Sequence, residues 1–401
     1  MVQESTYKNI AVIGCGAAGG FVSVLLSKNP YNNVVAFDIK EPFLTLLPTG
    51  GGRCNLTYQE DDVREFVKNY PRGEKFLISV FSRFGQKKTR EMFRDLGIKT
   101  YVQDDRRVFP VSNSSEQTIK TLQKHLQVSN FSFKKEKVIK ISKVDGTFFV
   151  ETENSDYKFD AVIIATGGKG NGFDFAKNFG HNIIATKPSL CALDIQEKYL
   201  YNLSGLSFKN VEICARLGKK KYPTVYGDIL FAHKSITGPA AFKVSALSAF
   251  EELSEQSPLE LSLRLIDTTE EKIDAVIREN SKKTVKNVFS MFAPESYILE
   301  ILNSACINPD KQTAQLKKVE KEFIINSLLG LKLNAVKRIK DSEIVTAGGV
   351  DLKEVNSKTM ESKLVKGLYF IGEVLNIDAY TGGFNLQNCW STAYIASMDL
   401  N

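Results

Sequence analysis

Three glycines in a row, followed at once by an arginine, a cysteine and an asparagine, are the first feature of this sequence that could do chemistry. The stretch reads TGGGRCNLT over residues 49–57. Glycine loses more conformational freedom on folding than any other residue, so three together are costly unless something approaches the backbone closely. Arg53 then offers a charge, Cys54 a thiol and Asn55 an amide. Two interpretations are open: a loop that lies against a bound ligand, or a flexible surface turn.

Glycines spaced as Gly-x-Gly-x-x-Gly follow a short apolar run near the N-terminus. The run, Ile10–Ile13, has the length of a buried parallel strand, and the glycines are Gly14, Gly16 and Gly19. Apolar residues then recur at helical spacing, and Asn32 and Asn33 predict a turn. A second predicted strand then ends in Asp38, 19 residues after Gly19. The order of these features predicts a dinucleotide-binding site rather than an ordinary glycine turn: a strand, a glycine turn, a helix, a second strand and an acidic residue.

Each residue type in this pattern has a physical role toward a dinucleotide. The first glycine allows the tight turn, the second lets the backbone approach the pyrophosphate, and the third packs the helix against the strand. The helix begins at Ala17 and Ala18, where free N–H groups and the positive end of the helix dipole favour phosphate. Asp38 can accept hydrogen bonds from the adenosine ribose. This pattern alone does not distinguish FAD from NAD.

A second segment decides between the two dinucleotides. Residues 137–160 alternate apolar and polar side chains around the turn dipeptides DG and NS, which predicts an antiparallel meander. A fully apolar strand, Ala161–Ala165, follows and ends in Thr166 and Gly167. This arrangement resembles the FAD-binding domain of two-dinucleotide-fold flavoproteins. In a simple NAD dehydrogenase, strands and helices would continue to alternate, so the segment favours FAD. Thr166 and Gly167 are therefore predicted to contact FAD.

A third segment, residues 367–395, predicts a strand, a glycine-rich loop and a helix that begins at Asn385. The N-terminus of that helix would stabilise the negative charge that reduction places at flavin N1 and C2=O. The glutamate after the strand can accept a hydrogen bond from a ribityl or ribose hydroxyl. The alternative is an ordinary strand–loop–helix with glycine caps, but the two earlier signals favour the flavin. The residues predicted to contact FAD here are Gly372, Glu373, Gly383, Asn385 and Leu386.

Four longer stretches carry a resemblance to a known family. They are GGGRCNLT at 50–57, GDILFAHKSITGP at 227–239, AGGVDLKEVNSKTMESK at 347–363 and GLYFIGEVLNIDAYTGGFNLQ at 367–387. The chain resembles the bacterial BaiN-like, or aminoacetone-oxidase-like, NAD(P)/FAD-dependent oxidoreductases. The resemblance implies an α/β fold with a discontinuous Rossmann-type FAD-binding domain at 1–188 and 341–401. It also implies an inserted β-rich, barrel-like domain at 189–266 and 330–340, and an inserted helical domain at 267–329.

The resemblance also implies roles for individual residues. The triple-glycine loop would run beside the flavin, with the backbone of Gly51 and Gly52 approaching it. Arg53 and Asn55 would then hydrogen-bond cofactor or substrate. Cys54 is either a redox thiol or a small, inert buried residue. Gly349 would make a further close approach to FAD. Two stretches depart from the family pattern, EPFLTLLPT before the triple glycine and the shortened loop after ATGG. Because both lie near the cofactor in the family, this chain can differ from it in its affinity for the cofactor or in the shape of its substrate site.

His233 matches a histidine of the family pattern. A titratable imidazole that faces a flavin site can act as acid or base, and a structural histidine that bonds loop backbone is the alternative. We predict His233 and Arg53 as the catalytic residues, with Arg53 orienting an anionic or carbonyl group of the substrate.

The composition indicates an ordinary globular chain and excludes several other classes. The chain has 401 residues, 43% of them hydrophobic and 25% charged, which is enough for two or three domains. The net charge of +7 is modest and its basic clusters lack interleaved aromatics, so nucleic acid is not a favoured partner. A polar N-terminus and the lack of a membrane-length apolar run predict a cytoplasmic protein without a membrane partner. Six scattered cysteines and three histidines predict neither disulfides nor a metal site.

Together these features predict an FAD-dependent oxidoreductase that transfers a hydride between flavin N5 and a small organic substrate. No second complete Gly-x-Gly-x-x-Gly is present, so a separate NAD(P)H-binding domain is not expected. Either NAD(P)H binds transiently at the flavin, or oxygen or another carrier exchanges the electrons. Two alternatives stay open: a flavoenzyme that modifies RNA, and a non-catalytic flavin-binding redox sensor.

Overall fold

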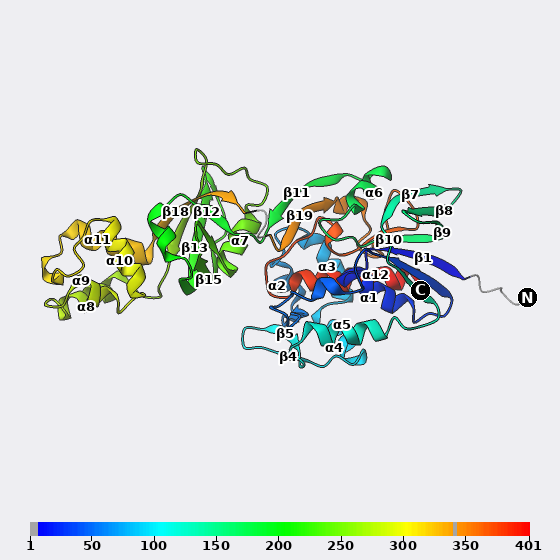
Figure 1. Cartoon of the computed structure of the whole chain (residues 1–401), viewed down its shortest axis with the longest axis horizontal. Helices are drawn as coiled ribbons and strands as arrows, with labels where there is room; N and C mark the ends of the chain where they lie inside the picture. Colours follow the sequence, from blue (N-terminus) through cyan, green and yellow to red (C-terminus); the bar gives the residue numbers. More distant parts are fainter. Residues whose placement is uncertain (1–6, 340–342) are drawn as a thin grey trace, which may run out of the picture. The chain divides into compact units, whose positions relative to one another are not determined.

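The computed structural model describes residues 7–339 and 343–401 and divides into two compact units (Figure 1). The first unit comprises Met1–Lys187 and Val345–Asn401, and the second comprises Pro188–Ile344. The second unit is therefore an insertion within the first, and each has a hydrophobic core of its own. Within the described ranges, no helix has the length and apolar character needed to cross a bilayer.

The first unit is built on a five-stranded parallel sheet with the order β20-β10-β1-β2-β6. Its strands are β1 (Lys8–Ile13), β2 (Asn32–Phe37), β6 (Phe131–Lys134), β10 (Ala161–Ile164) and β20 (Leu368–Phe370). Strand β10 is buried along its whole length, as expected of a parallel strand covered on both faces. The chain builds outward from β1 through β2 to β6 and then crosses to β10 on the other side. Such a reversal of strand order is where Rossmann folds bind their ligands.

Two helices from opposite ends of the chain pack against each other beside this sheet (Figure 1). They are α1 (Ala17–Leu26), in which every residue is buried, and α12 (Phe384–Leu400). The other helices of the unit are α2 (Val63–Val67), α3 (Glu74–Arg83), α4 (Gln86–Asp95), α5 (Ser115–Lys124) and α6 (Gly172–Asn178). Its short 3-10 turns are η1 (Leu44–Leu46), η5 (Leu352–Glu354) and η6 (Gly372–Val374).

Three smaller sheets complete the first unit. The antiparallel meander lies where the sequence predicts it, as β7 (Val138–Val144), β8 (Thr147–Thr152) and β9 (Asp156–Phe159). A second sheet contains β3 (Thr57–Tyr58), β5 (Arg107–Pro110) and β4 (Thr100–Val102). A two-stranded sheet pairs β11 (Ile183–Ser189) with β19 (Val345–Val350).

The second unit contains a closed barrel. Its sheet runs β14-β13-β15-β16-β12-β18-β17, and β13 pairs with β17 to close six of these strands into a ring. The strands are β12 (Leu193–Ile195), β13 (Ser207–Leu217), β14 (Lys220–Lys221), β15 (Val225–Phe231), β16 (Ser235–Thr237), β17 (Leu259–Arg264) and β18 (Leu331–Arg338). The turn η2 (Lys198–Leu203) and the helix α7 (Pro239–Leu247) belong to the same part. Alternate residues of β17 are buried, as barrel strands require.

The remainder of the second unit is helical. It contains α8 (Glu270–Glu279), α9 (Val285–Phe289), α10 (Glu295–Ser304), η3 (Thr313–Gln315) and α11 (Lys318–Leu329). Thr269 caps α8 by accepting a hydrogen bond from the Lys272 amide, as the sequence TTEE predicts. Barrel and helices share one cluster of buried apolar side chains. The division of the insertion into two domains, with boundaries at 267 and 329, stays a prediction, and residues 340–342 at the predicted return point lie outside the described ranges.

Two local predictions from the sequence need correction. Asn32 and Asn33, expected to form a turn, are the first two residues of β2. The strand tolerates Asn32 because its buried amide donates to the Leu26 carbonyl at 3.2 Å and to Asn401 Oδ1 at 2.8 Å. The last helix begins at Phe384 rather than Asn385, because Gly383 takes the position before the first turn with a φ of 98°.

Candidate functional site

The glycine turn between β1 and α1 has the close packing that a dinucleotide site requires. Gly14 has a φ of 94°, and a Cβ there would lie 2.6 Å from the Ala165 carbonyl oxygen. A Cβ at Gly19 would lie only 1.8 Å from the Gly14 carbonyl oxygen. Helix and strand therefore approach each other more closely than any side chain would allow, as predicted for the first and third glycines of the pattern.

Asp38 lies at the end of β2 beside this turn. Its Oδ2 accepts a hydrogen bond from the Cys15 amide at 2.7 Å, and its Oδ1 accepts one from the Lys40 amide at 3.0 Å. The carboxylate is half-buried, and each oxygen keeps a further lone pair for a hydroxyl. The Ala17 amide at the start of α1 donates to Thr45 Oγ1 at 3.1 Å, so Thr45 lies at the helix end predicted to bind phosphate.

The triple-glycine loop presents an open face. Gly51 and Gly52 have φ values of 67° and 81°, and a Cβ at either position would have no atom within 4 Å. The Arg53 guanidinium lies 4.1 Å from the centroid of the Phe109 ring, and its Nε donates to the Gly50 carbonyl at 3.3 Å. The loop therefore holds its cation by stacking, with no carboxylate within ion-pair distance among the described residues.

Several buried oxygens near these segments have no hydrogen-bond partner within the described part of the chain. The Asn55 side chain is 7% exposed and its Oδ1 accepts no hydrogen bond. Thr166 Oγ1 and Asn388 Oδ1 are also buried and also have no hydrogen-bond partner among the described residues. A buried polar atom without a partner is costly, so native structures rarely keep one without a ligand or water. Because a flavin dinucleotide carries many hydroxyls and ring N–H groups, these residues fit the predicted cofactor.

Gly372 and Glu373, which follow β20, contact the glycine turns that follow β1 and β10. Glu373 Oε1 accepts a hydrogen bond from the Thr346 amide at 2.9 Å, and a Cβ at Gly168 would lie 2.9 Å from the same oxygen. The adjacent Gly372 has a φ of 72°, and a Cβ there would lie 2.8 Å from Ala18 Cβ. The segment after β20 therefore contacts both the turn after β10, which includes Gly167, and the start of α1. Segments that are far apart in the sequence meet at the carboxyl ends of β1, β10 and β20.

The start of α12 lies against the strand that follows the triple-glycine loop. A Cβ at Gly383 would lie 2.6 Å from the carbonyl carbon and oxygen of Thr57. The Asn385 side chain folds back on the preceding loop, accepting from the Ala379 amide and donating to the Ala379 carbonyl, both at 2.9 Å. Asn385 therefore shapes the loop, and Leu386 beside it is half-buried.

Gly349 and His233 have surroundings that differ from those of the other predicted site residues. A Cβ at Gly349 would meet the Val374 carbonyl oxygen at 2.6 Å, so the close approach is to the chain's own backbone. His233 is exposed in the loop between β15 and β16 of the second unit, with its ring 6.4 Å from that of Tyr201. The roles predicted for both, toward cofactor and catalysis, stay predictions.

Cys54 and Cys389 are thiols at neutral pH. Burial raises the pKa of each to about 12. At Cys54 a hydrogen bond from Thr49 opposes the shift, and at Cys389 the charge of Glu373 adds to it. Nucleophilic and redox cysteines need accessible thiolate, so both environments favour the inert interpretation. All six cysteines are free, and the described residues contain no group of side chains that could hold a metal.

No local sequence pattern indicates the side chains that hold these segments together. Arg72 forms a two-point ion pair with Asp378, which is fully buried in the loop before α12. Gln387 accepts a hydrogen bond from the Thr57 hydroxyl at 2.6 Å. The single tryptophan, Trp390, donates to the Leu56 carbonyl at 2.9 Å. All of these partners lie some 300 residues apart along the chain, which is why no local pattern reveals them.

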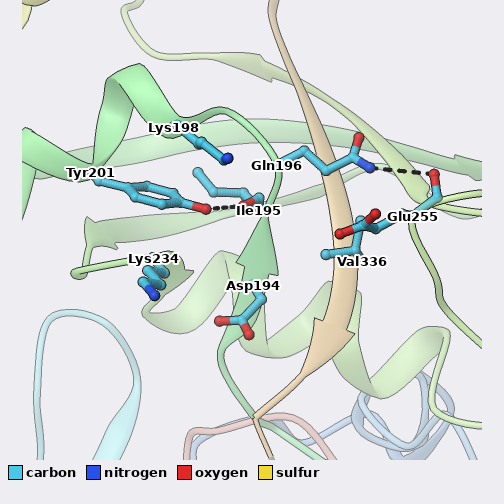
Figure 2. Close-up of a pocket in the computed structure, with 8 residues that line it drawn as sticks. All are labelled: Asp194, Ile195, Gln196, Lys198, Tyr201, Lys234, Glu255 and Val336. Atoms are coloured by element: carbon cyan, nitrogen blue, oxygen red, sulfur yellow. Dashed lines mark hydrogen bonds between the residues drawn. The ribbon is translucent and has the colours of Figure 1, made fainter.

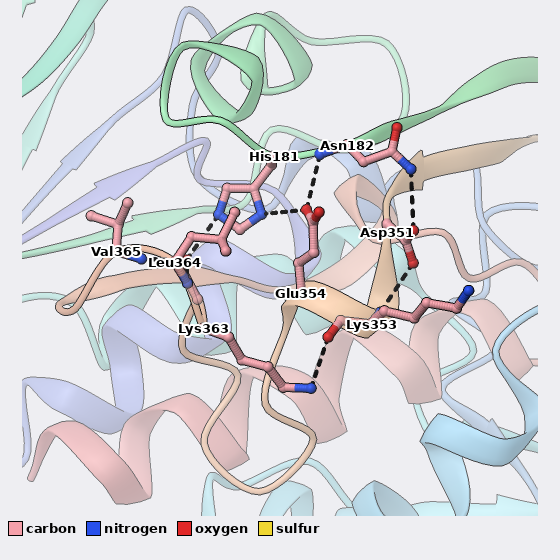
Figure 3. Close-up of polar contacts among 9 residues, drawn as sticks. His181, Asn182, Asp351, Lys353, Glu354, Lys363, Leu364 and Val365 are labelled. Carbon is pink, nitrogen blue, oxygen red and sulfur yellow. Dashed lines mark hydrogen bonds and ion pairs between the residues drawn. The ribbon is translucent and has the colours of Figure 1, made fainter.

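A buried histidine joins a second polar cluster in the first unit (Figure 3). Ser362 Oγ accepts hydrogen bonds from the amides of Leu364 at 3.0 Å and Val365 at 2.9 Å. Its two lone pairs are then used, so its hydroxyl donates to His181 Nε2, 2.8 Å away. Nδ1 therefore carries the proton and donates to Glu354 Oε2 at 3.1 Å. This arrangement stabilises the neutral imidazole, because a protonated Nε2 would find no acceptor.

Acidification is expected to destabilise the protein through His181. Burial lowers the pKa of the imidazole below its ordinary 6.5, and this effect outweighs the hydrogen bond to Glu354, which raises it. The unfolded chain therefore binds a proton at a higher pH than the folded chain, so stability is present above pH 6.5 and falls as the pH drops below it. Urea unfolding of the wild type and His181→Gln between pH 7.5 and about 5.5 should show a smaller pH slope in the variant. Equal slopes would contradict this.

Comparison with known proteins identifies the family of the chain. The model of the HI0933-like protein Rossmann domain matches residues 8–399. The chain is 27% identical to a ribosomal RNA dihydrouridine synthase of Haemophilus influenzae, over 99% of both chains, and 26% identical to one of Escherichia coli, over 97% of both. It is also 26% identical to the 3-dehydro-bile acid delta(4,6)-reductase of Clostridium scindens, over 96% of this chain and 97% of the reductase. These matches confirm the resemblance drawn from the sequence: the chain belongs to the HI0933-like family of Rossmann-domain flavoprotein oxidoreductases.

Proposed function

We propose that this protein binds FAD and reduces a carbon–carbon double bond conjugated to a carbonyl in a small organic substrate. The observation that carries the proposal is the meeting of residues 14–19, 166–168 and 372–373 at one end of the parallel sheet. Beside them lie buried oxygens that have no hydrogen-bond partner among the residues that the structure describes. Bound FAD would supply hydride transfer at flavin N5.

The residues of the first unit have distinct roles in this proposal. The N-terminus of α1 binds the pyrophosphate, and Asp38 accepts from the adenosine ribose. Glu373 accepts from a ribityl hydroxyl, and Asn55 accepts from a ring N–H or a hydroxyl. The N-terminus of α12 stabilises the negative charge of the reduced ring system.

The names of the full-length relatives support the reaction class. Making dihydrouridine saturates a double bond conjugated to a uracil carbonyl, and a delta(4,6)-reductase of a 3-dehydro bile acid acts on double bonds conjugated to a ketone. In both reactions the carbon far from the carbonyl accepts a hydride and the carbon next to it accepts a proton. Arg53 has guanidinium donors available for the carbonyl or an anionic group, and His233 is the proposed proton donor.

The electron donor proposed is NADH or NADPH, bound transiently at the flavin. The experiment is a visible spectrum of the purified protein, followed by anaerobic addition of each nicotinamide and then of an enone. A flavin spectrum that bleaches with NAD(P)H and returns with the enone is expected. A flavin that bleaches but does not return would contradict the substrate class. A flavin that neither donor bleaches would indicate an oxidase or a redox sensor, and no flavin after reconstitution with FAD would contradict the whole proposal.

A second candidate function is the reduction of uridine in ribosomal RNA. Two relatives that match along their whole length carry this activity in their names, which is the observation in its favour. Mass spectrometry of ribosomal RNA from a strain lacking the gene would show the loss of a dihydrouridine. RNA that copurifies at low salt and is released by high salt would support the same function.

Replacing Cys54 by alanine is expected to leave flavin reduction unchanged within about twofold, because a neutral buried thiol has no redox role. The rate of bleaching by the effective nicotinamide would be measured in both proteins at equal flavin content. Loss of turnover in a variant that retains its flavin would contradict the inert interpretation. Cys214→Ala, at an exposed thiol of the second unit, is the matched control.

A further inference from the structure

Two strands of the first unit position Glu373, and both are anchored beside the buried imidazole of His181. The first is β19, in which the Thr346 amide donates to Glu373 Oε1 at 2.9 Å. Asp351 follows β19 directly: its amide donates to the Asn182 carbonyl at 3.0 Å, and its Oδ2 accepts from the Asn182 side chain at 3.1 Å. The strand that holds the Glu373 carboxylate is therefore fastened to the chain next to His181.

The second strand is β20, which ends at Phe370, just before the segment that contains Glu373. The Phe370 ring lies 4.7 Å from the His181 ring, edge to face. The Ser362 amide donates to the Leu368 carbonyl at 2.7 Å, and the Ser362 hydroxyl lies 2.8 Å from His181 Nε2. A movement of Ser362 away from the imidazole therefore acts on the strand that leads into the candidate FAD site.

The imidazole of His181 cannot exchange its contacts for water. Exposed charged groups elsewhere in the chain can do so: in the pocket of the second unit that Figure 2 shows, Lys198, Lys234 and Glu255 are exposed, so water solvates them. The His181 side chain has no exposed surface. The protein itself must therefore accommodate a proton on this imidazole.

Protonation of His181 conflicts with the hydrogen bonds of Ser362 (Figure 3). Neutral Nε2 accepts from the Ser362 hydroxyl, whose lone pairs accept from the amides of Leu364 at 3.0 Å and Val365 at 2.9 Å. A proton on Nε2 would place an N–H against an oxygen without a free lone pair, so one of these hydrogen bonds must break. The Glu354 carboxylate favours the charged ring, but burial has the larger effect on the pKa of the imidazole and lowers it.

Apart from the carboxylate on Nδ1, no charged group among the described residues contacts the imidazole. Asp351 binds Asn182, and the Lys363 ammonium donates to a backbone carbonyl of η5 at 2.8 Å. On α6, which precedes the histidine, Asp174 and Lys177 are exposed and lie 3.8 Å from each other. No neighbouring carboxylate can therefore replace the serine as the partner of Nε2.

We propose that the cluster of His181, Glu354 and Ser362 makes the binding of FAD depend on pH. The neutral imidazole holds β19 and β20 in the arrangement that positions Glu373, whereas protonation separates the imidazole from Ser362 and loosens both strands. FAD then binds less tightly. Because coupling between two sites is reciprocal, bound FAD also opposes protonation of His181. This inference rests on the proposed FAD site and adds the regulation of that site by protons.

The experiment measures the dissociation constant for FAD at about pH 7.5, 6.5 and 5.5 in the full-length wild type and in His181→Gln, both first stripped of flavin. Glutamine keeps a neutral acceptor for Ser362 and a neutral donor for Glu354 but does not titrate. The constant of the wild type is expected to rise about tenfold from pH 7.5 to 5.5, because an imidazole with the ordinary pKa of 6.5 in the FAD-free protein is about 90% protonated at pH 5.5. The constant of the variant should change by less than about twofold.

His125→Gln is the matched control. His125 Nε2 lies 3.0 Å from the Leu96 carbonyl oxygen, an acceptor that a protonated ring can keep. This variant should therefore show the pH dependence of the wild type. Circular dichroism at each pH establishes that the proteins are folded.

The outcomes distinguish the pH coupling from the proposed function. No binding of FAD by the wild type at about pH 7.5 would contradict both. Binding at that pH with equal pH dependence in the wild type and in folded His181→Gln would contradict the coupling alone.

If His181→Gln does not fold, the wild type alone decides. Binding of FAD should release about one proton near pH 5.5 and none near pH 7.5, since the bound protein keeps the imidazole neutral. Calorimetry in two buffers of different ionisation enthalpy measures this release. Binding near pH 5.5 without proton release would overturn the proposal.

Discussion

Asp378→Asn is expected to lower the free energy of unfolding by about 3–5 kcal/mol, because breaking a buried ion pair leaves an uncompensated charge in the interior. Asp378 is fully buried, and the side chain of Arg72, which it binds at two points, is 14% exposed. The variant keeps the shape of the side chain and removes only the charge that balances the guanidinium. Urea unfolding, followed by the fluorescence of Trp390, measures the change.

The matched control for this prediction is a surface ion pair. Glu41 and Lys135 lie 3.0 Å apart with both side chains more than half exposed, so Glu41→Gln should leave the unfolding midpoint unchanged. Asp378 lies in the loop between Glu373 and Gly383, so its loss should also weaken the binding of FAD. An Asp378→Asn protein as stable as the Glu41→Gln protein would show that the buried pair contributes nothing.

Gly383→Ala is expected to lower stability by about 2–4 kcal/mol and to abolish flavin binding, because the new methyl group meets backbone that cannot move. Its Cβ would lie 2.6 Å from the carbonyl carbon and oxygen of Thr57, at a φ of 98° that side chains rarely adopt. The start of α12 would have to move away from β3, and with it the helix end assigned to the reduced flavin. Denaturant unfolding and the flavin-to-protein absorbance ratio measure the two effects.

Gly51→Ala is the control that separates the effect of backbone strain on stability from the effect of the close contact at Gly383. Gly51 also has a positive φ, 67°, but a Cβ there would have no neighbour within 4 Å. Only the strain of the left-handed conformation is then added, which is about 1–2 kcal/mol. If Gly51→Ala and Gly383→Ala lose equal stability, the contact with Thr57 is not the cause. If Gly51→Ala alone loses the flavin, the open face of the triple-glycine loop lies against the cofactor, as the sequence predicts.

The elements of the fold could be predicted from sequence because their signals are local. The glycine spacing after β1, the apolar run of β10 and the turn dipeptides of the meander each lie within a few residues of the structure that they specify. The same holds for the capping threonine of α8. Asn32 shows the limit, since an asparagine pair predicts a turn unless distant partners, here Asn401 and the end of α1, satisfy its amide.

The contacts that assemble the site could not be predicted in this way. These contacts join residues that only the folded chain brings together. Examples are the pairing of β13 with β17, the ion pair of Arg72 with Asp378 and the hydrogen bond between His181 and Ser362. Charged residues are usually solvated, so nothing marks Asp378 as buried. At Gly349 the family pattern suggests a nearby ligand, and the structure adds a second reason for a glycine that the sequence does not reveal, the close approach of backbone of the same unit.

The interruption of the first unit by the second has a consequence for synthesis on the ribosome. Strands β1, β2, β6 and β10 emerge early, but β20 and α12 lie within residues 368–400, after the whole insertion. Domains generally fold as units while the chain is being made, so the barrel and its helices can fold while the first unit still lacks an edge strand and the partner of α1. Until those last residues emerge, the apolar surface of α1 that α12 covers stays exposed. Nascent chains of this protein are therefore expected to need chaperone protection of the first unit until residues 368–400 have emerged, and to acquire flavin only after that.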